Sequence, residues 1–177
     1  MASLDDVVGL LRAGRSFDLS EPSGPGHDLL DHSLQTAELL RASYPGERAL
    51  QLAGLVHDIG HMLAPHSDDA HAVAAAAFVR PLLGDRIAEL VRLHVPAKRY
   101  LVTTDAGYRA CLERDSVISL EHQGGDMSPG EILDFEADAE FRHAVALRRA
   151  DDAGKVPGLA VPGLDSWLDA LEREAAP

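Results

Sequence analysis

The chain has 177 residues, with 29 Asp and Glu against 16 Lys and Arg, which gives a formal net charge of -13. That length is typical of one domain with its own core, and a hydrophobic share of 46% is ordinary for a soluble globular protein. The acidic balance excludes an electrostatic nucleic-acid binder, because such a protein needs a basic face to meet phosphate groups. A small anion can still bind where a buried cluster of Lys, Arg or metal ions outweighs the overall negative field.

Cysteine use and hydropathy bear on the compartment of the protein. The single cysteine, Cys111, excludes an internal disulfide and a cysteine-rich zinc site. The first residues show no basic segment followed by an apolar run, so we expect no signal peptide. No apolar stretch approaches the roughly 20 residues that span a bilayer. These features predict a cytoplasmic protein without a membrane partner.

Apolar residues recur at helical spacing along almost the whole chain, and no useful stretch alternates with period two. The first helix is predicted over 3–13, with Ser3 as its N-cap and Gly14 as its stop. After the Gly- and Pro-rich loop 16–28, the predicted helices are 29–42, 47–61, 69–83, 86–94, 129–136, 141–151 and 164–175. The pattern predicts a single all-α domain that spans residues 1–177.

Three local signals set the limits of these later helices. Asp68 or Asp69 is the expected cap of the helix that runs to Leu83. Pro96 makes continuation of helix 86–94 unfavourable, so we expect that helix to end before it. Ser128, followed by a proline at the first helical position, predicts the start of helix 129–136.

The segment from Leu55 to His61, with the sequence LVHDIGH, carries the strongest chemical signal. The imidazole of His57 can bind one metal ion, whereas the two carboxylate oxygens of Asp58 can bridge two. We expect His61, four residues after His57, to lie on the same helical face one turn later. An isolated His-Asp pair is more often a surface pair, but this one follows an apolar stretch, which favours a metal site.

Four further residues complete a candidate ligand set: His32, His71, His94 and Asp151. Two of these histidines also fit purely structural roles, since His71 suits a partly exposed helix position and His94 suits a helix C-terminus. Asp151 is unusual near the end of a helix, because the macrodipole disfavours a carboxylate there unless a cation holds it. Its position therefore modestly favours a ligand role.

The pattern H…HD…D in an all-helical chain resembles the HD-domain superfamily, whose fold is a helical bundle. The stretches HSLQTAELL, RLHVPAKRYL and QGGDMSPGEILDF look like its oxygenase branch. Within that branch they resemble the iron-dependent dioxygenases that cleave 2-amino-1-hydroxyethylphosphonate and its trimethylammonium analogue; the likeness to myo-inositol oxygenase is more distant. The resemblance covers about 28–164, the expected core of the HD domain.

The resemblance implies two iron ions in a mixed-valent Fe(II)/Fe(III) pair, with dioxygen as co-substrate. The implied ligands are His32, His57, Asp58 and Asp151 for the first iron and Asp58, His71 and His94 for the second. Imidazoles and carboxylates without a thiolate suit non-haem iron. His66 competes with His71, and we favour His71 because helical sequence flanks it.

Substrate residues follow from charge and from the resemblance. Lys98 and Arg99 form a rare adjacent cation pair in this acidic chain, and lysine is a good partner for phosphate oxygens. The alternative is a solvated pair at a helix end. Ser116 and Ser119, three residues apart, can face one anion from a helical turn. The full predicted substrate set is His61, Lys98, Ser116, Ser119 and Gln123, with Asp58, His61 and Lys98 as catalytic residues.

The chain departs from the resemblance just before the first ligand. The relatives carry a Tyr and a Glu there, and the Glu reads the amino group of the substrate, whereas 21–32 has no Tyr and keeps only the distant Glu21. A 1-hydroxyphosphonate without a cationic amine is therefore at least as good a candidate as an aminated one.

The predicted function is oxidative cleavage of the C–P bond of a small 1-hydroxyphosphonate, giving phosphate and a carboxylate. The expected partner is this small organophosphonate, and the expected state is a monomer or a small homo-oligomer. The alternatives are a metal-dependent HD phosphohydrolase acting on a phosphate ester or nucleotide and a catalytically silent metal-binding HD domain.

Overall fold

The computed structural model describes residues 3–17, 28–64, 70–112 and 114–175, and every regular element in these ranges is a helix. The first five α-helices are α1 (Leu4–Ala13), α2 (Leu29–Ser43), α3 (Arg48–Val56), α4 (Gly60–Leu63) and α5 (His71–Thr104). The next five are α6 (Ala106–Ala110), α7 (Arg114–His122), α8 (Pro129–Glu136), α9 (Phe141–Ala153) and α10 (Leu168–Glu174). Two 3-10 turns, Gly14–Ser16 and Leu164–Trp167, accompany them. The prediction of an all-α fold is confirmed.

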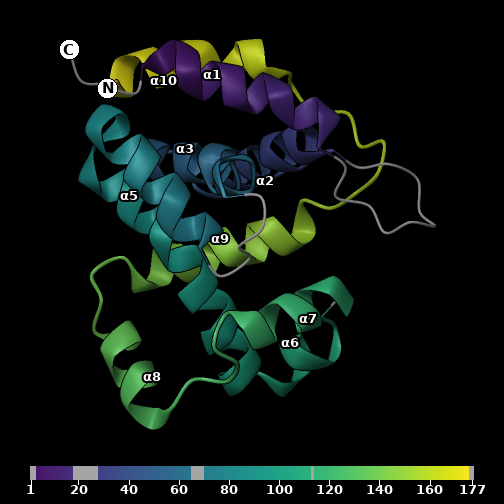
Figure 1. The fold of residues 1–177 in the computed structure, drawn as a ribbon, viewed down its shortest axis with the longest axis vertical. Coiled ribbons are helices and arrows are strands. Elements are labelled where there is room, and N and C mark those ends of the chain that lie inside the picture. The colour runs from purple at the N-terminus through teal and green to yellow at the C-terminus, as the bar shows by residue number, and fades with distance from the viewer. Residues whose placement is uncertain (1–2, 18–27, 65–69, 113, 176–177) are drawn as a thin grey trace.

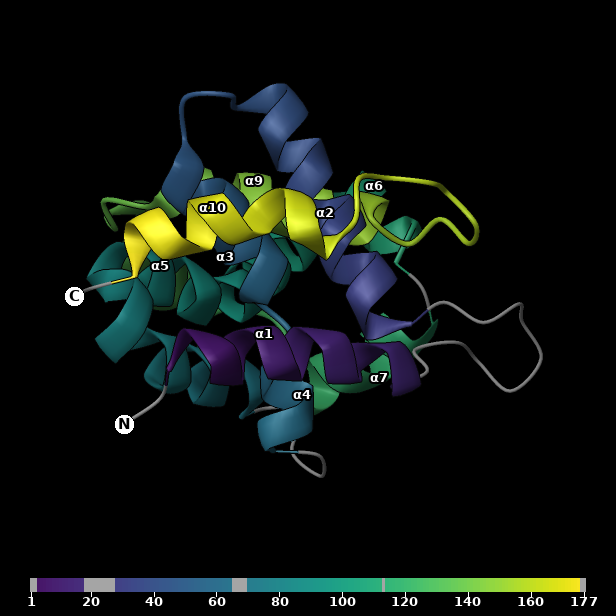
Figure 2. The ribbon, with the colours of Figure 1, turned by 90° about the horizontal axis from the view of Figure 1, so that it is seen from above.

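Helices α2, α3, α5 and α9 form the centre of the bundle. Figure 1 shows α1 and α10 at one end of the long axis, α6, α7 and α8 at the other, and α5 between them. Seen from above, α1 and α10 cover the same end of the bundle (Figure 2). Their apolar faces close the core there, since Leu11 of α1 and Leu171 of α10 are buried with Leu50 and Leu147 in one cluster.

Two predicted helix starts, those capped by Ser3 and Ser128, are confirmed. The backbone N–H of Asp6 donates to Ser3 Oγ at 3.2 Å, and the backbone N–H of Ser3 donates back to Asp6 Oδ2 at 2.8 Å. Ser128 and Glu131 form the same reciprocal capping box at the start of α8. These caps satisfy N–H groups that the first helical turn leaves without partners.

The prediction of one helix over 47–61 is wrong. Helix α3 ends at Val56, and α4 begins only at Gly60, so His57 and His61 do not share a face of one helix. The break coincides with a close backbone approach: a Cβ at position 60 would lie 1.8 Å from the carbonyl oxygen of His71. Glycine is the residue that permits this contact.

The prediction that a helix ends before Pro96 is also wrong, because α5 continues to Thr104. An internal proline costs roughly 3 kcal/mol, but Leu93 and Ala97 on either side of it are buried against Phe135 of α8 in a second apolar cluster. The predicted end of a helix at Leu83 does coincide with a kink, since the next residue, Gly84, has a φ of 83° within α5.

The start of α5 and the segment after it differ from the expected pattern in other ways. Asp68 and Asp69, the expected caps, lie outside the described residues; α5 begins at His71 with no side-chain cap at Ala70. Helices α6 and α7 follow α5 where the sequence pattern predicted no helix.

Among the described helices, none has the length and apolar character required to cross a membrane.

Candidate metal centre

The structure brings the six predicted ligand residues together in the centre of the bundle. His32 comes from α2, His57 and Asp58 from the turn after α3, and Asp151 from α9. His71 and His94 lie on α5, one at its start and the other 23 residues later. All six side chains belong to buried residues, which is unusual for Asp and for four His in one place.

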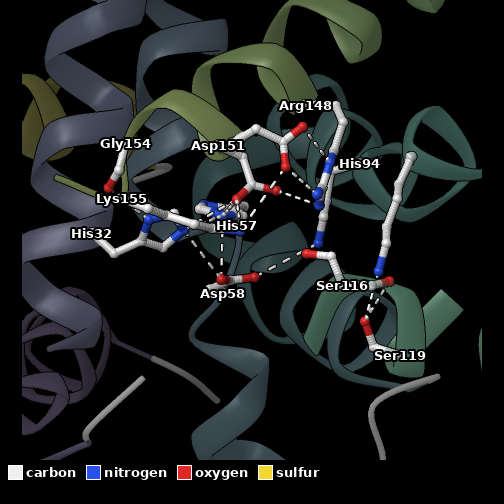
Figure 3. Close-up of polar contacts among 12 residues, drawn as sticks. His32, His57, Asp58, His94, Ser116, Ser119, Arg148, Asp151, Gly154 and Lys155 are labelled. Atoms are coloured by element: carbon white, nitrogen blue, oxygen red, sulfur yellow. Dashed lines mark hydrogen bonds and ion pairs between the residues drawn. The ribbon is translucent and has the colours of Figure 1, made fainter. Parts of the chain in front are cut away.

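The first group consists of His32, His57 and Asp151. The Nε2 atoms of the two histidines are 3.3 Å apart. Asp151 Oδ1 lies 3.2 Å from His32 Nε2 and 3.8 Å from His57 Nε2 (Figure 3). One ion can contact all three ligand atoms, because these lie within 4.8 Å of one another.

The second group consists of Asp58, His71 and His94. The Nε2 atoms of its two histidines are 3.0 Å apart, and Asp58 Oδ1 lies 3.7 Å and 3.6 Å from them. The other carboxylate oxygen of Asp58 faces the first group, at 3.4 Å from His32 Nε2 and 3.3 Å from His57 Nε2. One carboxylate therefore faces both groups, and the arrangement is that of a dinuclear metal site.

Hydrogen bonds on the far side of the rings fix the orientation of three imidazoles. The Nδ1 atoms of His32, His57 and His94 lie 3.0, 2.8 and 2.6 Å from the backbone carbonyl oxygens of Gly154, Gly54 and Val91. A carbonyl only accepts, so each Nδ1 carries a proton and donates it, and Nε2 is the ring atom that faces the cluster. The Nε2 atoms lie close together, and a cation between them, a proton or a metal ion, offsets their mutual repulsion.

The shifted pKa values of the cluster also indicate that it favours bound positive charge. Although burial alone would lower it, the charge of Asp58 raises the pKa of His57 to about 10. The charge of His57 overcomes the opposing effect of burial and holds the pKa of Asp58 well below its ordinary value. Burial and the neighbouring His71 lower the pKa of His94, which keeps that ring neutral. A bound metal takes the place of the cluster protons.

Lys98 is a buried lysine close enough to Asp151 and Arg148 for their charges to act on its pKa. Its Nζ donates to Ser119 Oγ at 2.6 Å and to Gln123 Oε1 at 3.0 Å, which joins α5 to α7 and the turn after it. Ser116 is also buried, one turn before Ser119 on α7 (Figure 3). The structure thus brings together four of the five predicted substrate residues: Lys98, Ser116, Ser119 and Gln123.

His61, the fifth predicted substrate residue, extends the second group outward from α4. Its ring stacks on that of His71 at 4.2 Å with an angle of 12° between the planes. Its Nε2 lies 3.8 Å from Asp58 Oδ1, and its side chain is 24% exposed, more than any predicted ligand here. His61 is therefore placed where it can meet both the cluster and a molecule that enters from solvent.

Sequence reasoning missed a buried arginine next to the candidate ligand Asp151. Arg148 Nη1 donates to Asp151 Oδ2 at 2.6 Å (Figure 3), whereas the other oxygen of Asp151 faces His32 and His57. The only signal in the sequence was its position three residues before Asp151, which is common on solvated helix faces. His66, the alternative to His71, and Glu21 lie outside the described residues.

A protein-family model described as "HD domain" matches residues 29–139, a span that holds His32, the His57-Asp58 pair and both histidines of α5. The chain belongs to the HD-domain family. The segment that follows this match supplies the last candidate ligand, Asp151, from α9. The HD pair itself lies at the centre of the two groups, where the family signature predicts it.

Two matches that cover most of the chain place it among phosphonate dioxygenases. The chain is 40% identical over 189 residues to a hydroxymethylphosphonate dioxygenase of Gimesia maris, covering 96% of this chain and 94% of the relative. It is 32% identical over 164 residues to a [1-hydroxy-2-(trimethylamino)ethyl]phosphonate dioxygenase (glycine-betaine-forming) of Leisingera caerulea, covering 88% of this chain and 80% of the relative. A shorter match, 48% identical over 46 residues, covers 26% of this chain and 13% of inositol oxygenase 1 of Arabidopsis thaliana. The resemblance to this oxygenase branch is confirmed.

Proposed function

We propose that this HD-domain protein is an iron-dependent oxygenase that cleaves the C–P bond of a small 1-hydroxyphosphonate to give phosphate and a carboxylate. The observation that carries the proposal is the 40% identity, over nearly the whole of both chains, to a hydroxymethylphosphonate dioxygenase. The two groups of ligands that share Asp58 and lie beside buried Lys98 agree with it.

In this proposal His32, His57, Asp58 and Asp151 hold one iron, and Asp58, His71 and His94 hold the other. A set of imidazoles and carboxylates without a thiolate suits iron and leaves positions for small ligands. The bound iron pair, in a mixed-valent Fe(II)/Fe(III) state, supplies the redox chemistry with dioxygen. The chain itself supplies orientation and charge.

The protein side chains bind the anion and hold it still beside the metals. Lys98 offers a positive charge that Ser119 and Gln123 already orient, so little ordering is needed when a phosphonate oxygen approaches. Ser116 and Ser119 offer hydroxyl donors from the same side of α7, and His61 closes the site from α4. Burial excludes water and strengthens each of these contacts.

Hydroxymethylphosphonate is the substrate that fits best. The relative that matches 96% of this chain carries this compound in its name. Residues 21–32 contain no Tyr, and their one glutamate, Glu21, lies far from the position of the Glu that accompanies an aminated substrate in the dioxygenases that this chain resembles. With this substrate, one dioxygen converts the hydroxymethyl carbon to formate and releases phosphate, and the atoms balance without a further reductant.

A substrate panel tests the proposal. The iron-loaded protein is given hydroxymethylphosphonate, an aminated 1-hydroxyphosphonate and a phosphate monoester, each with and without oxygen. We expect oxygen-dependent phosphate release that is fastest for hydroxymethylphosphonate. Equal release with and without oxygen, or release from the monoester alone, would support the phosphohydrolase alternative, which draws on the same ligands.

Substrate binding is expected to weaken as the pH rises above neutrality. Burial, with the nearby charge of Arg148, lowers the pKa of Lys98 to about 7 in the free protein. Above that pH the lysine loses the charge that attracts the phosphonate, so kcat/KM falls by up to about tenfold per pH unit. Lys98→Met is expected to lower kcat/KM at neutral pH and to remove its further fall at higher pH. Ionisation of the substrate affects the wild type and the variant equally, so it cannot explain a difference between them. If kcat/KM of Lys98→Met fell above pH 7 as steeply as that of the wild type, the role of Lys98 would be contradicted.

A cytoplasmic location, a monomer or small homo-oligomer and the absence of nucleic-acid partners remain predictions that complete this proposal.

A further inference from the structure

The guanidinium of Arg148 joins a candidate metal ligand to a second acidic residue. Its Nη1 donates to Asp151 Oδ2 at 2.6 Å, while its Nη2 donates to Asp152 Oδ1 and its Nε to Asp152 Oδ2 at 3.1 Å. The arginine is only 5% exposed, and the combined attraction of Asp151 and Asp152, which burial strengthens, outweighs the cost of burying it. Oδ1 of Asp151 is thereby left facing the histidines of the first group.

Tyr108 fixes the other side of this arrangement. Its hydroxyl donates to Asp152 Oδ2 at 2.6 Å and accepts from Arg148 Nε at 2.9 Å. The fork of Arg148 on Asp152 and the bridging hydroxyl form a closed ring of three side chains, which leaves the guanidinium one orientation.

The position of Tyr108 is set by contacts that do not involve the metal cluster. Asp105 caps α6, with Oδ1 accepting from the backbone N–H groups of Gly107 and Tyr108 at 3.0 Å each. Arg149 of α9 forms an ion pair with the other oxygen of Asp105 at 3.6 Å. The tyrosine therefore reaches α9 from a helix whose own anchoring contacts do not involve Arg148, Asp151 or Asp152.

We propose that Tyr108 and Asp152 are positioning residues that act through Arg148 on Asp151 and set the affinity of the metal site formed by His32, His57 and Asp151. The inference rests on the dinuclear centre of the proposed function. Without the ring, the guanidinium is free to turn and Asp151 loses the hold on its outer oxygen; Lys155, whose Nζ lies 3.8 Å from Asp151 Oδ1, then competes for the oxygen that faces the metal. The Asp58, His71 and His94 site does not use Asp151, so its affinity is not expected to change.

The test compares metal binding by the wild type, Tyr108→Phe and Tyr100→Phe. The last is a matched control, because Tyr100 also donates its hydroxyl to a carboxylate, that of Glu136 at 2.8 Å, but on an exposed surface. Each metal-free protein is titrated anaerobically with Fe(II) and followed by calorimetry. We expect two equivalents in the wild type and the control, and in Tyr108→Phe a roughly tenfold to hundredfold weaker binding of one equivalent only.

Asp152→Asn keeps the size of the side chain but weakens the charged fork, and we expect it to show the same selective loss; Asp152→Glu is expected to restore part of it. Circular dichroism verifies that the variants are folded. Wild-type affinity for both equivalents in Tyr108→Phe and Asp152→Asn, or an equal loss of both, would overturn the inference. If the wild type binds two irons but shows no oxygen-dependent turnover, the proposed function fails while the positioning role remains supported by the titration.

Discussion

Asp58→Ala is expected to abolish binding of both metal ions and all turnover. One oxygen of this carboxylate lies within 3.4 Å of His32 Nε2 and His57 Nε2, and the other within 3.7 Å of His71 Nε2 and His94 Nε2. Removing it deprives each group of a ligand and also of the negative charge that offsets two divalent or trivalent ions. Metal analysis of the purified variant, together with phosphate release from hydroxymethylphosphonate, measures the loss.

Asp85→Ala is the control for this substitution. Asp85 is an aspartate whose side chain is 88% exposed, whose partner is Arg80 and which belongs to neither ligand group. We expect it to retain two irons and wild-type turnover, since exposed ion pairs contribute little. An Asp58→Ala variant that keeps two irons would contradict the bridging position assigned to Asp58.

Gly60→Ala is expected to destabilise the protein by about 3 kcal/mol and to disrupt the second group of ligands. The added Cβ would meet the His71 carbonyl oxygen at 1.8 Å and the His71 Cα at 3.0 Å. Backbone atoms cannot turn away as a long side chain does, so either α4 or the start of α5 has to move. His71 and the stacked ring of His61 move with them. Urea denaturation gives the change in the free energy of unfolding, and metal titration gives the change in affinity.

Gly130→Ala provides the comparison for Gly60→Ala. Gly130 lies in α8, and a Cβ there would meet nothing within 4 Å. We expect its stability to stay the same or rise by up to about 1 kcal/mol, because alanine has the higher helix propensity. Wild-type stability and metal affinity in Gly60→Ala would show that the backbone contact with His71 has no structural importance.

The elements that the sequence predicted well are those whose determinants lie within four residues. Ser3 and Ser128 identified two helix starts because a cap and its partner belong to the same turn. Pro96 misled the prediction because its cost is local, whereas the apolar contacts that offset it come from α8 and α9. The break between His57 and His61 depends on the contact of Gly60 with His71, which no local pattern contains.

The candidate site divides in the same way. Residue types and the HD signature were enough to select the six ligand candidates, and the structure brings all six into two groups. Asp151 was singled out because a carboxylate is disfavoured at a helix end without a cation. The structure adds Arg148 and Lys155 as cations that accompany it. Arg148 and its partner Tyr108 were missed, since their pairing depends on burial and on a contact across 40 residues.

In the proposed reaction the buried cluster uses dioxygen to break a C–P bond. The oxygen consumed and the phosphate released from hydroxymethylphosphonate can be measured on the same sample of iron-loaded protein. We expect one phosphate and one formate for each dioxygen and no phosphate without oxygen. Phosphate release that continues unchanged under anaerobic conditions would contradict an oxygenase reaction.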